Sequence, residues 1–259
     1  MSNLPKISVP IICSNNEGTI TKVLESIKDL AFEIIVIVDH NSKDRTIEIA
    51  KEYTTNVFQE EWRGYSNQKN EALSRCTGDW ILSLDSDEVV TEQLKSEILQ
   101  AVQLGDKEGY FLSRRTFYIG KFMNYAWMPD ARLRLAKSSA NPKWDGSNVH
   151  ELLLIDGEVG SLNGYLDHYS YEDINDHFSR TLKYAHDVAS DRFKAGKKFF
   201  LLKLLFAPPF AFFKEYIFKR AIFDGLRGLI ASASAGVYSF LKNVYLWELY
   251  ENKKNKKNK

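Results

Sequence analysis

Cysteine is scarce in this sequence of 259 residues, and so are features that would carry the chain into or through a membrane. There are only two cysteines, Cys13 and Cys76, and residues 1–10 carry no secretory signal before a strand pattern begins. These absences favour a reducing, cytosolic setting. The apolar stretch 197–213 is interrupted by Lys203 and Pro208-Pro209. A spanning helix needs about 20 apolar residues, so we expect this stretch to be interfacial.

Two nucleotide-binding motifs are also missing. No G-x-G-x-x-G follows the first predicted strand, and no G-x-x-x-x-G-K-[ST] occurs in the chain. Their absence argues against a dinucleotide-dependent enzyme and against a P-loop NTPase. The chain has no internal repeat, and its length suits one large domain or a domain with an appendage.

Charge is distributed unevenly along the chain. Residues 193–259 contain 14 basic and 4 acidic residues, a net charge of +10, whereas residues 1–192 carry a net charge of −9. An acidic body followed by a basic tail suggests an anionic surface as a partner.

The first fifty residues alternate between strand and helix patterns. Residues 7–13 form an apolar strand pattern, in which Pro10 is best tolerated near a sheet edge or at an irregularity. Apolar residues at helical spacing predict a helix over 19–29. The β-branched run 33–39 predicts a strand buried on both faces, and a second helix begins near Thr46. This order predicts a parallel α/β sheet with right-handed crossovers.

Polar clusters follow the predicted strands at residues 14–17, 39–44 and 85–88. Ligands of such sheets bind at the carboxyl ends of the strands. We therefore expect these three clusters to form one binding edge.

The stretch 77–88, T-G-D-W-I-L-S-L-D-S-D-E, is the centre of the prediction. A turn signal precedes a short apolar strand that ends in Asp85, Asp87 and Glu88. Burying such close like charges costs several kcal/mol each unless positive groups lie among them. Asp85 and Asp87 are expected on one strand face, where they would suit Mg²⁺ or Mn²⁺. The alternative is a solvated acidic turn.

Four motifs occur in a characteristic order: N-N-E-x-x-I from residue 15, V-D-H-N-S-K-D-x-T from residue 38, Q-K-N-x-A-L from residue 68, and G-D-W-I-L-S-L-D-S-D-E from residue 78. This series resembles family 2 glycosyltransferases of the GT-A fold, closely over about the first hundred residues. It is most similar to the branch that adds a sugar to the lipopolysaccharide inner core, the β-1,4-glucosyltransferase-like group. The implied fold is a Rossmann-like mixed α/β sheet, the nucleotide-diphospho-sugar transferase fold.

The resemblance also implies site residues. The residues implied to bind the nucleotide sugar lie at the strand ends, before the D-x-D motif and within it. They are Ile12, Ser14, Glu17, Asp39, Asn41, Lys69, Asn70, Asp85 and Ser86. Asp87 is expected to be the chief holder of the metal and diphosphate, with Asp85 nearer the ribose or bridging through water. Taken alone, Lys69 and Asn70 would be interpreted as ordinary surface residues. The chain departs from the family pattern at His40-Asn41, where a small Ser or Gly pair is common.

The second half of the chain is expected to build the acceptor wall. Short strand patterns at 110–112, 132–135 and 152–155 flank an aromatic-rich segment, whose rings could stack on sugars or form a core. The lipopolysaccharide-type branch has an R-L segment, then H-E, then H-Y-S, which correspond here to residues 132–135, 150–151 and 168–170. By this resemblance, His150 or His168 would contact the metal or diphosphate, and Glu151 would be the general base. A structural histidine–glutamate hydrogen bond is the alternative.

Two other carboxylates of this half, Asp130 and Asp145, adjoin Pro129 and Gly146 and are expected first as turn residues. The general base must lie away from the leaving group, which excludes Asp85 and Asp87 because the cation holds them there. Glu151 is therefore the predicted base and Asp130 the reserve.

The expected domains are a GT-A domain over 1–190, a helical amphipathic extension over 191–252 and a basic disordered tail over 253–259. The GT-A domain divides into a nucleotide-sugar half, 1–104, and an acceptor half, 105–190. The extension is expected to associate with the membrane surface. A helical pair packed on the GT-A body is the alternative.

The sequence thus predicts an inverting glycosyltransferase that uses Mg²⁺ or Mn²⁺ and a UDP-sugar, most simply UDP-glucose. Its acceptor would be a lipid-linked saccharide, and it would lie peripherally at the cytoplasmic face of the bacterial inner membrane. The partners expected are this donor, this acceptor and an anionic membrane surface, with no nucleic acid; the oligomeric state is left open. The alternatives are transfer to another cell-envelope glycan, a sugar-1-phosphate nucleotidyltransferase, and a catalytically silent membrane-bound binding protein.

Overall fold

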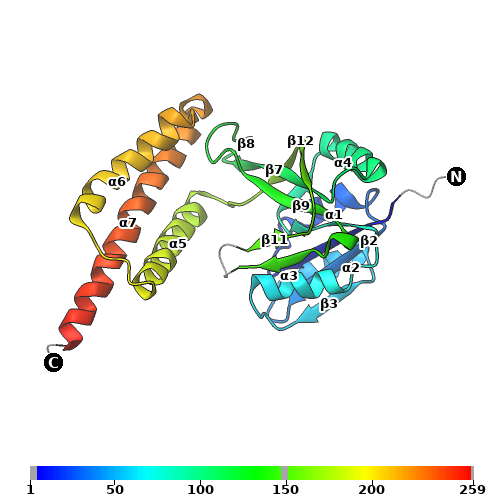
Figure 1. The fold of residues 1–259 in the computed structure, drawn as a ribbon, viewed down its shortest axis with the longest axis horizontal. Helices are drawn as coiled ribbons and strands as arrows, with labels where there is room; N and C mark the ends of the chain where they lie inside the picture. The colour runs from blue at the N-terminus through cyan, green and yellow to red at the C-terminus, as the bar shows by residue number, and fades with distance from the viewer. Residues whose placement is uncertain (1–4, 147–150, 258–259) are drawn as a thin grey trace. The chain divides into compact units, whose positions relative to one another are not determined.

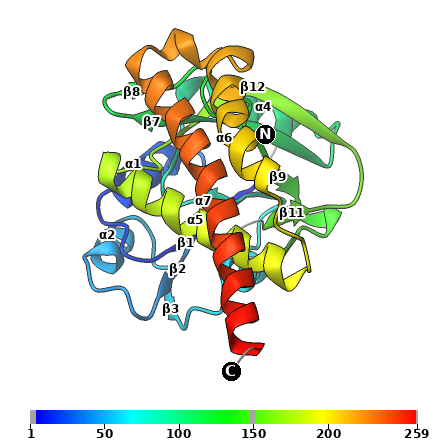
Figure 2. The same cartoon turned by 90° about the vertical axis from the view of Figure 1, so that its left-hand side faces the viewer.

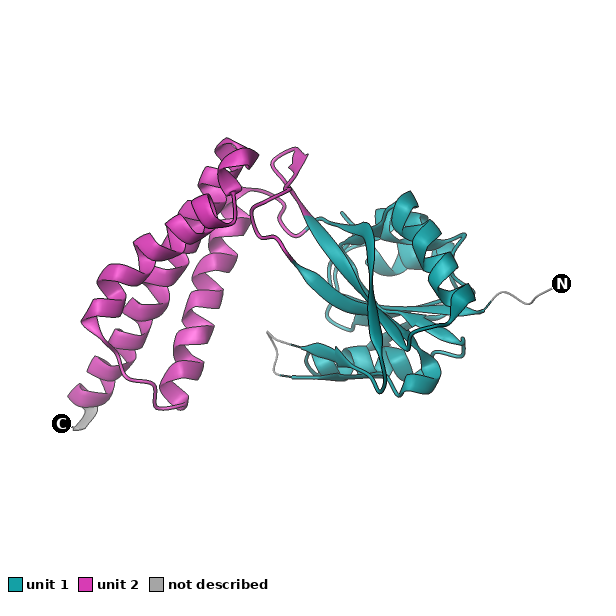
Figure 3. Cartoon of the chain, turned by 45° about the horizontal axis from the view of Figure 1, so that its top comes forward, with its two compact units in different colours: residues 1–115, 130–169 teal, residues 116–129, 170–259 magenta. Residues whose placement is uncertain are grey.

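The structure is a computed structural model that describes residues 5–146 and 151–257. The chain forms two compact units, coloured separately in Figure 3. Unit 1 comprises Met1–Arg115 and Asp130–Tyr169, and unit 2 comprises Thr116–Pro129 and Ser170–Lys259. The division differs from the expected boundary at residue 190, because that residue lies inside a helix of unit 2 and because residues 116–129 belong to unit 2 as well.

The amino-terminal part of unit 1 alternates strands with helices, as the sequence predicts (Figure 1). In chain order the elements are β1 (Ile7–Cys13), α1 (Ile20–Ile27), β2 (Glu33–Asp39), α2 (Thr46–Tyr53), β3 (Val57–Glu60), α3 (Tyr65–Ser74), β4 (Trp80–Leu82), β5 (Leu84–Asp85), β6 (Glu88–Val90) and α4 (Glu92–Leu104). Strands β3, β2, β1 and β4 lie side by side in that order and are parallel. Thr91 caps α4 by accepting a hydrogen bond from the Leu94 backbone N–H.

The later strands extend the same sheet in antiparallel directions. They are β7 (Gly109–Tyr118), β8 (Lys121–Phe122), β9 (Ala131–Lys137) and β12 (Val159–His168), while β10 (Lys143–Asp145) and β11 (Leu152–Leu154) form a separate pair. The sheet order is β3-β2-β1-β4-β9-β7-β12-β6, with β5 paired to β1 and β8 paired to β7. The sheet is therefore mixed, as expected. A short 3-10 helix, η1 (Ser138–Ala140), follows β9.

β1 lies in the interior of the sheet and is buried along its whole length. Its neighbours on one side are β4, opposite Ile7 and Ser8, and β5, opposite Ile11 and Ile12. Pro10 falls in the gap between these two pairings, where the missing N–H donor removes no ladder bond. The expected irregularity at Pro10 is thus present.

The acidic stretch does not form one continuous strand. Asp85 ends β5, residues 86–87 make a turn, and Glu88 begins β6, which pairs with β12 instead of β1. The expectation that Asp85 and Asp87 share one strand face is therefore wrong, because the alternation of side chains is broken by the turn. The two carboxylates reach different surroundings.

Unit 2 is mainly helical. Its elements are α5 (Ile174–Lys194), α6 (Leu201–Phe213), a π-helical turn η2 (Lys214–Phe218), a 3-10 turn η3 (Ala221–Asp224) and α7 (Leu226–Lys257). Helices α5 and α6 both pack on α7, as Figure 2 shows. α7 continues five residues into the segment that was expected to be a disordered tail. Among the described residues, no helix combines the length and the apolar character that crossing a bilayer requires.

Candidate active site

Asp85 is surrounded by positive side chains. Lys69 Nζ lies 2.7 Å from Asp85 Oδ1, Arg134 contacts Oδ2, and Arg114 Nη1 lies 3.8 Å from Oδ2. Burial raises the pKa of the Asp85 carboxyl, but Arg134 and then Lys69 outweigh it and hold this pKa well below its ordinary value. Asp85 is therefore an ionised carboxylate whose charge is already balanced by the protein.

Glu88 explains how the acidic stretch is tolerated. Its side chain is 0% exposed, and its Oε1 lies 2.6 Å from Arg134 Nη2 and 3.2 Å from Arg114 Nη1. Its Oε2 accepts a hydrogen bond of 3.0 Å from the Asp85 backbone N–H. The positive groups that the clustered carboxylates demand are thus present. From the sequence, Arg134 was expected in a strand, but neither Arg134 nor Arg114 was given a role. The one sequence feature that indicated such basic partners is the clustered acidic charge of residues 85–88, which requires positive groups nearby.

Asp87 faces a different partner, His168. The antiparallel register places Glu88 opposite His168, and the Tyr169 backbone N–H donates to the Asp87 carbonyl oxygen at 2.9 Å. As a result, His168 Nε2 lies 3.4 Å from Asp87 Oδ2. His150, the other histidine predicted to contact the metal or diphosphate, lies outside the described residues.

The pair of Asp87 and His168 fits a divalent cation. One carboxylate oxygen and one imidazole nitrogen converge, and Mg²⁺ is usually held by one or two carboxylates together with substrate phosphates and water. No cluster of three or more His, Cys, Asp or Glu side chains suited to a metal occurs within the described part of the chain. Asp85 was also predicted as a ligand, but it is directed toward Lys69 and Arg134.

Glu151 is joined to the same cluster through Lys69. Lys69 Nζ lies 3.2 Å from Glu151 Oε1, and the ammonium group sits 4.1 Å from the centre of the Trp144 ring. Lys69 is only 4% exposed although it is a lysine, so the alternative of a surface residue is wrong. Glu151 itself is partly exposed.

The two other candidate bases are placed differently. Asp130 is held by Arg114, whose Nη2 lies 2.6 Å from Oδ2, and by Arg132, whose Nε lies 2.9 Å from Oδ1. Asp145 is exposed at the end of β10, where its Oδ1 accepts a hydrogen bond from the Gly146 N–H. Glu151 is the carboxylate of the three that adjoins Lys69.

The ends of β1 and β2 form the neighbouring part of the site. Ser14 Oγ donates to Asp39 Oδ2 at 3.1 Å, and the Asn41 backbone N–H donates to Asp39 Oδ1 at 3.0 Å. Glu17 accepts from the Arg45 N–H, while its own N–H donates to Asp44, so the two loops are tied together. Predicted residues from separate clusters thus meet at one edge.

The other predicted site residues make mainly structural contacts. Ile12 is buried against Ala72 of α3. The Ser86 carbonyl accepts a hydrogen bond of 2.8 Å from Thr19 Oγ1, which ties the acidic turn to the start of α1. Both ends of the Asn70 amide bond the Trp144 backbone, at 2.8 and 2.9 Å, and so anchor β10 beside Lys69.

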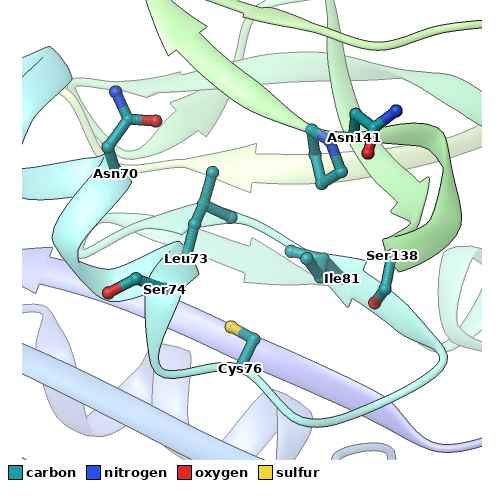
Figure 4. Close-up of a pocket in the computed structure, with 8 residues that line it drawn as sticks. Asn70, Leu73, Ser74, Cys76, Ile81, Ser138 and Asn141 are labelled. Atoms are coloured by element: carbon teal, nitrogen blue, oxygen red, sulfur yellow. The ribbon is translucent and has the colours of Figure 1, made fainter.

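A separate pocket of about 360 Å³ is lined by Asn70 and the other residues drawn in Figure 4. It is lined by Leu73, Cys76, Ile81 and Ser138, among others, and shares only Asn70 with the predicted site residues. Burial raises the pKa of the Cys76 thiol to about 12, so it is no nucleophile at neutral pH.

A mixed α/β sheet with the D-x-D motif Asp85-Ser86-Asp87 at its carboxyl edge defines the class as a GT-A-like transferase fold. The sequence profile of glycosyl transferase family 2 matches residues 8–151, and the chain belongs to this family. It is 30% identical over 260 residues to the lipopolysaccharide core biosynthesis glycosyltransferase LpsC of Rhizobium meliloti, covering 95% of this chain and 94% of LpsC. An uncharacterized glycosyltransferase of Rickettsia typhi is also 30% identical, over 95% of this chain and 88% of its own.

A solved structure shares the fold. The mannosyltransferase PcManGT of Pyrobaculum calidifontis, in complex with GDP-Man and Mn²⁺, superposes with a TM-score of 0.50 at 14% identity, covering 90% of this chain and 74% of the other. The fold expectation of a GT-A-like mixed α/β sheet is confirmed, and so is the expectation of a glycosyltransferase.

Proposed function

We propose that this glycosyltransferase moves a sugar, most simply glucose, from a UDP-sugar to a lipid-linked saccharide such as the lipopolysaccharide inner core, with inversion at the anomeric carbon. The observation that carries the proposal is the separation of two carboxylates: Asp87 meets His168, while Glu151 meets Lys69. Each carboxylate can then serve one side of a single displacement.

Asp87 and His168 form the leaving-group side. They would hold Mg²⁺ or Mn²⁺ against the diphosphate, and the cation would stabilise the negative charge that develops as the diphosphate departs. Lys69 and Arg134 keep Asp85 ionised and fixed beside it. The Mn²⁺ in the nucleotide-sugar complex of PcManGT supports this cation class.

Glu151 forms the acceptor side. A carboxylate near the anomeric carbon accepts the proton of the acceptor hydroxyl as the new bond forms. Lys69 orients Glu151 through its contact with Oε1. One displacement requires no covalent nucleophile, so the product has the inverted configuration.

The similarity to LpsC supports a lipopolysaccharide core acceptor, because it extends over almost the full length of both chains. Such an acceptor is carried by lipid, and we propose that the enzyme acts peripherally at the cytoplasmic face of the inner membrane. Transfer to another cell-envelope glycan is the second candidate. A silent binding protein is disfavoured, since Asp85, Asp87 and Glu151 are all present.

The test is release of UDP from a panel of UDP-sugars with lipopolysaccharide purified from a strain that lacks the gene. Acceptor-dependent turnover of UDP-glucose, and a mass gain of one hexose on the core, are expected. Turnover of another UDP-sugar alone would overturn glucose as the donor. A hexose gain on a different envelope glycan would overturn the core as the acceptor.

A further inference from the structure

Helix α6 of unit 2 has no buried residue, although it is strongly apolar. One side of it faces α7, since a Cβ on Gly236 would lie 3.3 Å from the Pro208 carbonyl oxygen and 3.7 Å from Phe212 Cβ. Phe206 and Phe210 precede these two residues by two positions each, which places them on the opposite side of the helix. Both are exposed, at 65% and 63%.

The exposed apolar surface continues beyond α6. Phe218 in η2, Phe223 in η3 and Leu226 at the start of α7 are also exposed, at 75%, 70% and 69%. We name these residues, together with Leu202, Phe206 and Phe210, the apolar face. Six large side chains exposed within 25 residues are more than a water-facing surface ordinarily carries, and such patches mark interaction sites.

The charge around the apolar face is predominantly positive. Residues 197–227 contain seven basic and two acidic residues. Both acidic side chains are engaged within unit 2: Glu215 Oε1 accepts a hydrogen bond from the Trp127 N–H, and Asp224 accepts from the N–H groups of residues 124–126. Exposed Lys203 and Lys214, by contrast, lie on α6 and directly after it. The surface that surrounds the apolar face is therefore cationic.

The prolines of α6 limit how deeply this helix can enter a lipid bilayer. Pro208 and Pro209 have no N–H, so the carbonyl oxygens four residues earlier, at Leu204 and Leu205, receive no helical hydrogen bond from them. Such oxygens are costly in hydrocarbon but can be hydrated among lipid headgroups. The helix thus suits the boundary between headgroups and acyl chains, where amphipathic helices lie in the plane of the membrane.

We propose that the apolar face docks on an anionic lipid bilayer, with its aromatic and leucine side chains below the headgroups and its lysines at the phosphates. This surface does not depend on glycosyl transfer. A second copy of the chain would bury the apolar side chains as well, but it would bring the cationic rims of two faces together.

The experiment measures co-sedimentation of the full chain with vesicles of phosphatidylcholine and of phosphatidylcholine with 30% phosphatidylglycerol. Phe206→Asp/Phe218→Asp should bind the anionic vesicles at least tenfold more weakly than the wild type. Leu104→Asp is the matched control, because Leu104 is 76% exposed at the end of α4 and lies outside the face. It should bind as the wild type does, and circular dichroism checks that each variant is folded.

The double variant Lys203→Glu/Lys214→Glu tests the electrostatic contribution to vesicle binding. It should weaken binding to anionic vesicles and make the remaining binding less sensitive to salt, with little effect on residual binding to phosphatidylcholine. Wild-type protein that does not sediment with anionic vesicles at low salt would overturn the proposal. So would a dimer, seen by analytical ultracentrifugation, that the Phe206→Asp/Phe218→Asp variant dissociates while vesicle binding stays unchanged.

Discussion

Lys69 connects the two halves of the candidate site, because its single ammonium group contacts both Asp85 and Glu151. It is almost fully buried, and the Trp144 ring lies against it. A buried ammonium needs such compensation, since desolvation of a charge costs several kcal/mol. The geometry of Glu151 therefore depends on a residue of the nucleotide-binding half.

Replacing Glu151 with Gln tests its role as the base. The amide oxygen can still accept a hydrogen bond from Lys69, but it cannot take a proton from the acceptor. Turnover should fall by about 10²-fold or more, while the affinity for UDP-sugar, measured by calorimetry, barely changes. Near-normal turnover in Glu151→Gln, with activity abolished in Asp130→Asn, would move the assignment to Asp130.

Glu88 is predicted to be structural. Glu88→Gln keeps the shape but removes the charge that balances Arg134 and Arg114 at a fully buried position. The free energy of unfolding should drop by about 3 kcal/mol, the range for breaking a buried ion pair. Chemical denaturation measures it, with the exposed Glu61→Gln as the control. Equal stability of the two variants would contradict the assignment.

Among the elements, α5 carries a buried histidine. His177 Nδ1 lies 2.7 Å from the Tyr118 hydroxyl oxygen, and the rings of Tyr118, Trp127 and Tyr171 surround it. Burial lowers the pKa of His177 below its ordinary value, and Asp176 offsets this only in part. The neutral form is thus favoured in the folded protein.

The stability of unit 2 should therefore depend on pH. With a pKa lower in the folded than in the unfolded state, the contribution of His177 is present above the unfolded value of about 6.5 and is lost as the pH falls below it. His177→Gln should flatten this part of the melting-temperature profile, whereas His186→Gln, at an exposed histidine of the same helix, should not. Identical profiles for the wild type and His177→Gln would contradict the prediction.

Some elements could be predicted from local sequence patterns alone, and others could not. β1 and β2 have the bounds that their apolar runs predict. The turn at residues 86–87 was missed, because it is set by pairing of β6 with β12, some eighty residues later. Arg114 and Arg134 were missed for the same reason: their partners in the acidic stretch, Glu88 for Arg114 and Asp85 for Arg134, lie 26 and 49 positions away.

At the scale of the whole molecule, the sequence separates charge between an acidic first part and a basic last part. The acidic part contains the proposed cation site, and the basic part contains the apolar face. These are the regions that the chemistry of a metal–diphosphate and of an anionic surface would require. The family assignment rests on the first part, whereas the similarity to LpsC extends through both.

The central claim is that a divalent cation held by Asp87 and His168 binds the diphosphate of the donor. The most direct measurement is calorimetric titration of UDP into the wild type with Mn²⁺ and with EDTA, and into Asp87→Asn with Mn²⁺. We predict that EDTA and Asp87→Asn each weaken UDP binding at least tenfold, while Asp87→Asn melts at the wild-type temperature. UDP affinity that is the same in EDTA as in Mn²⁺ would contradict the account.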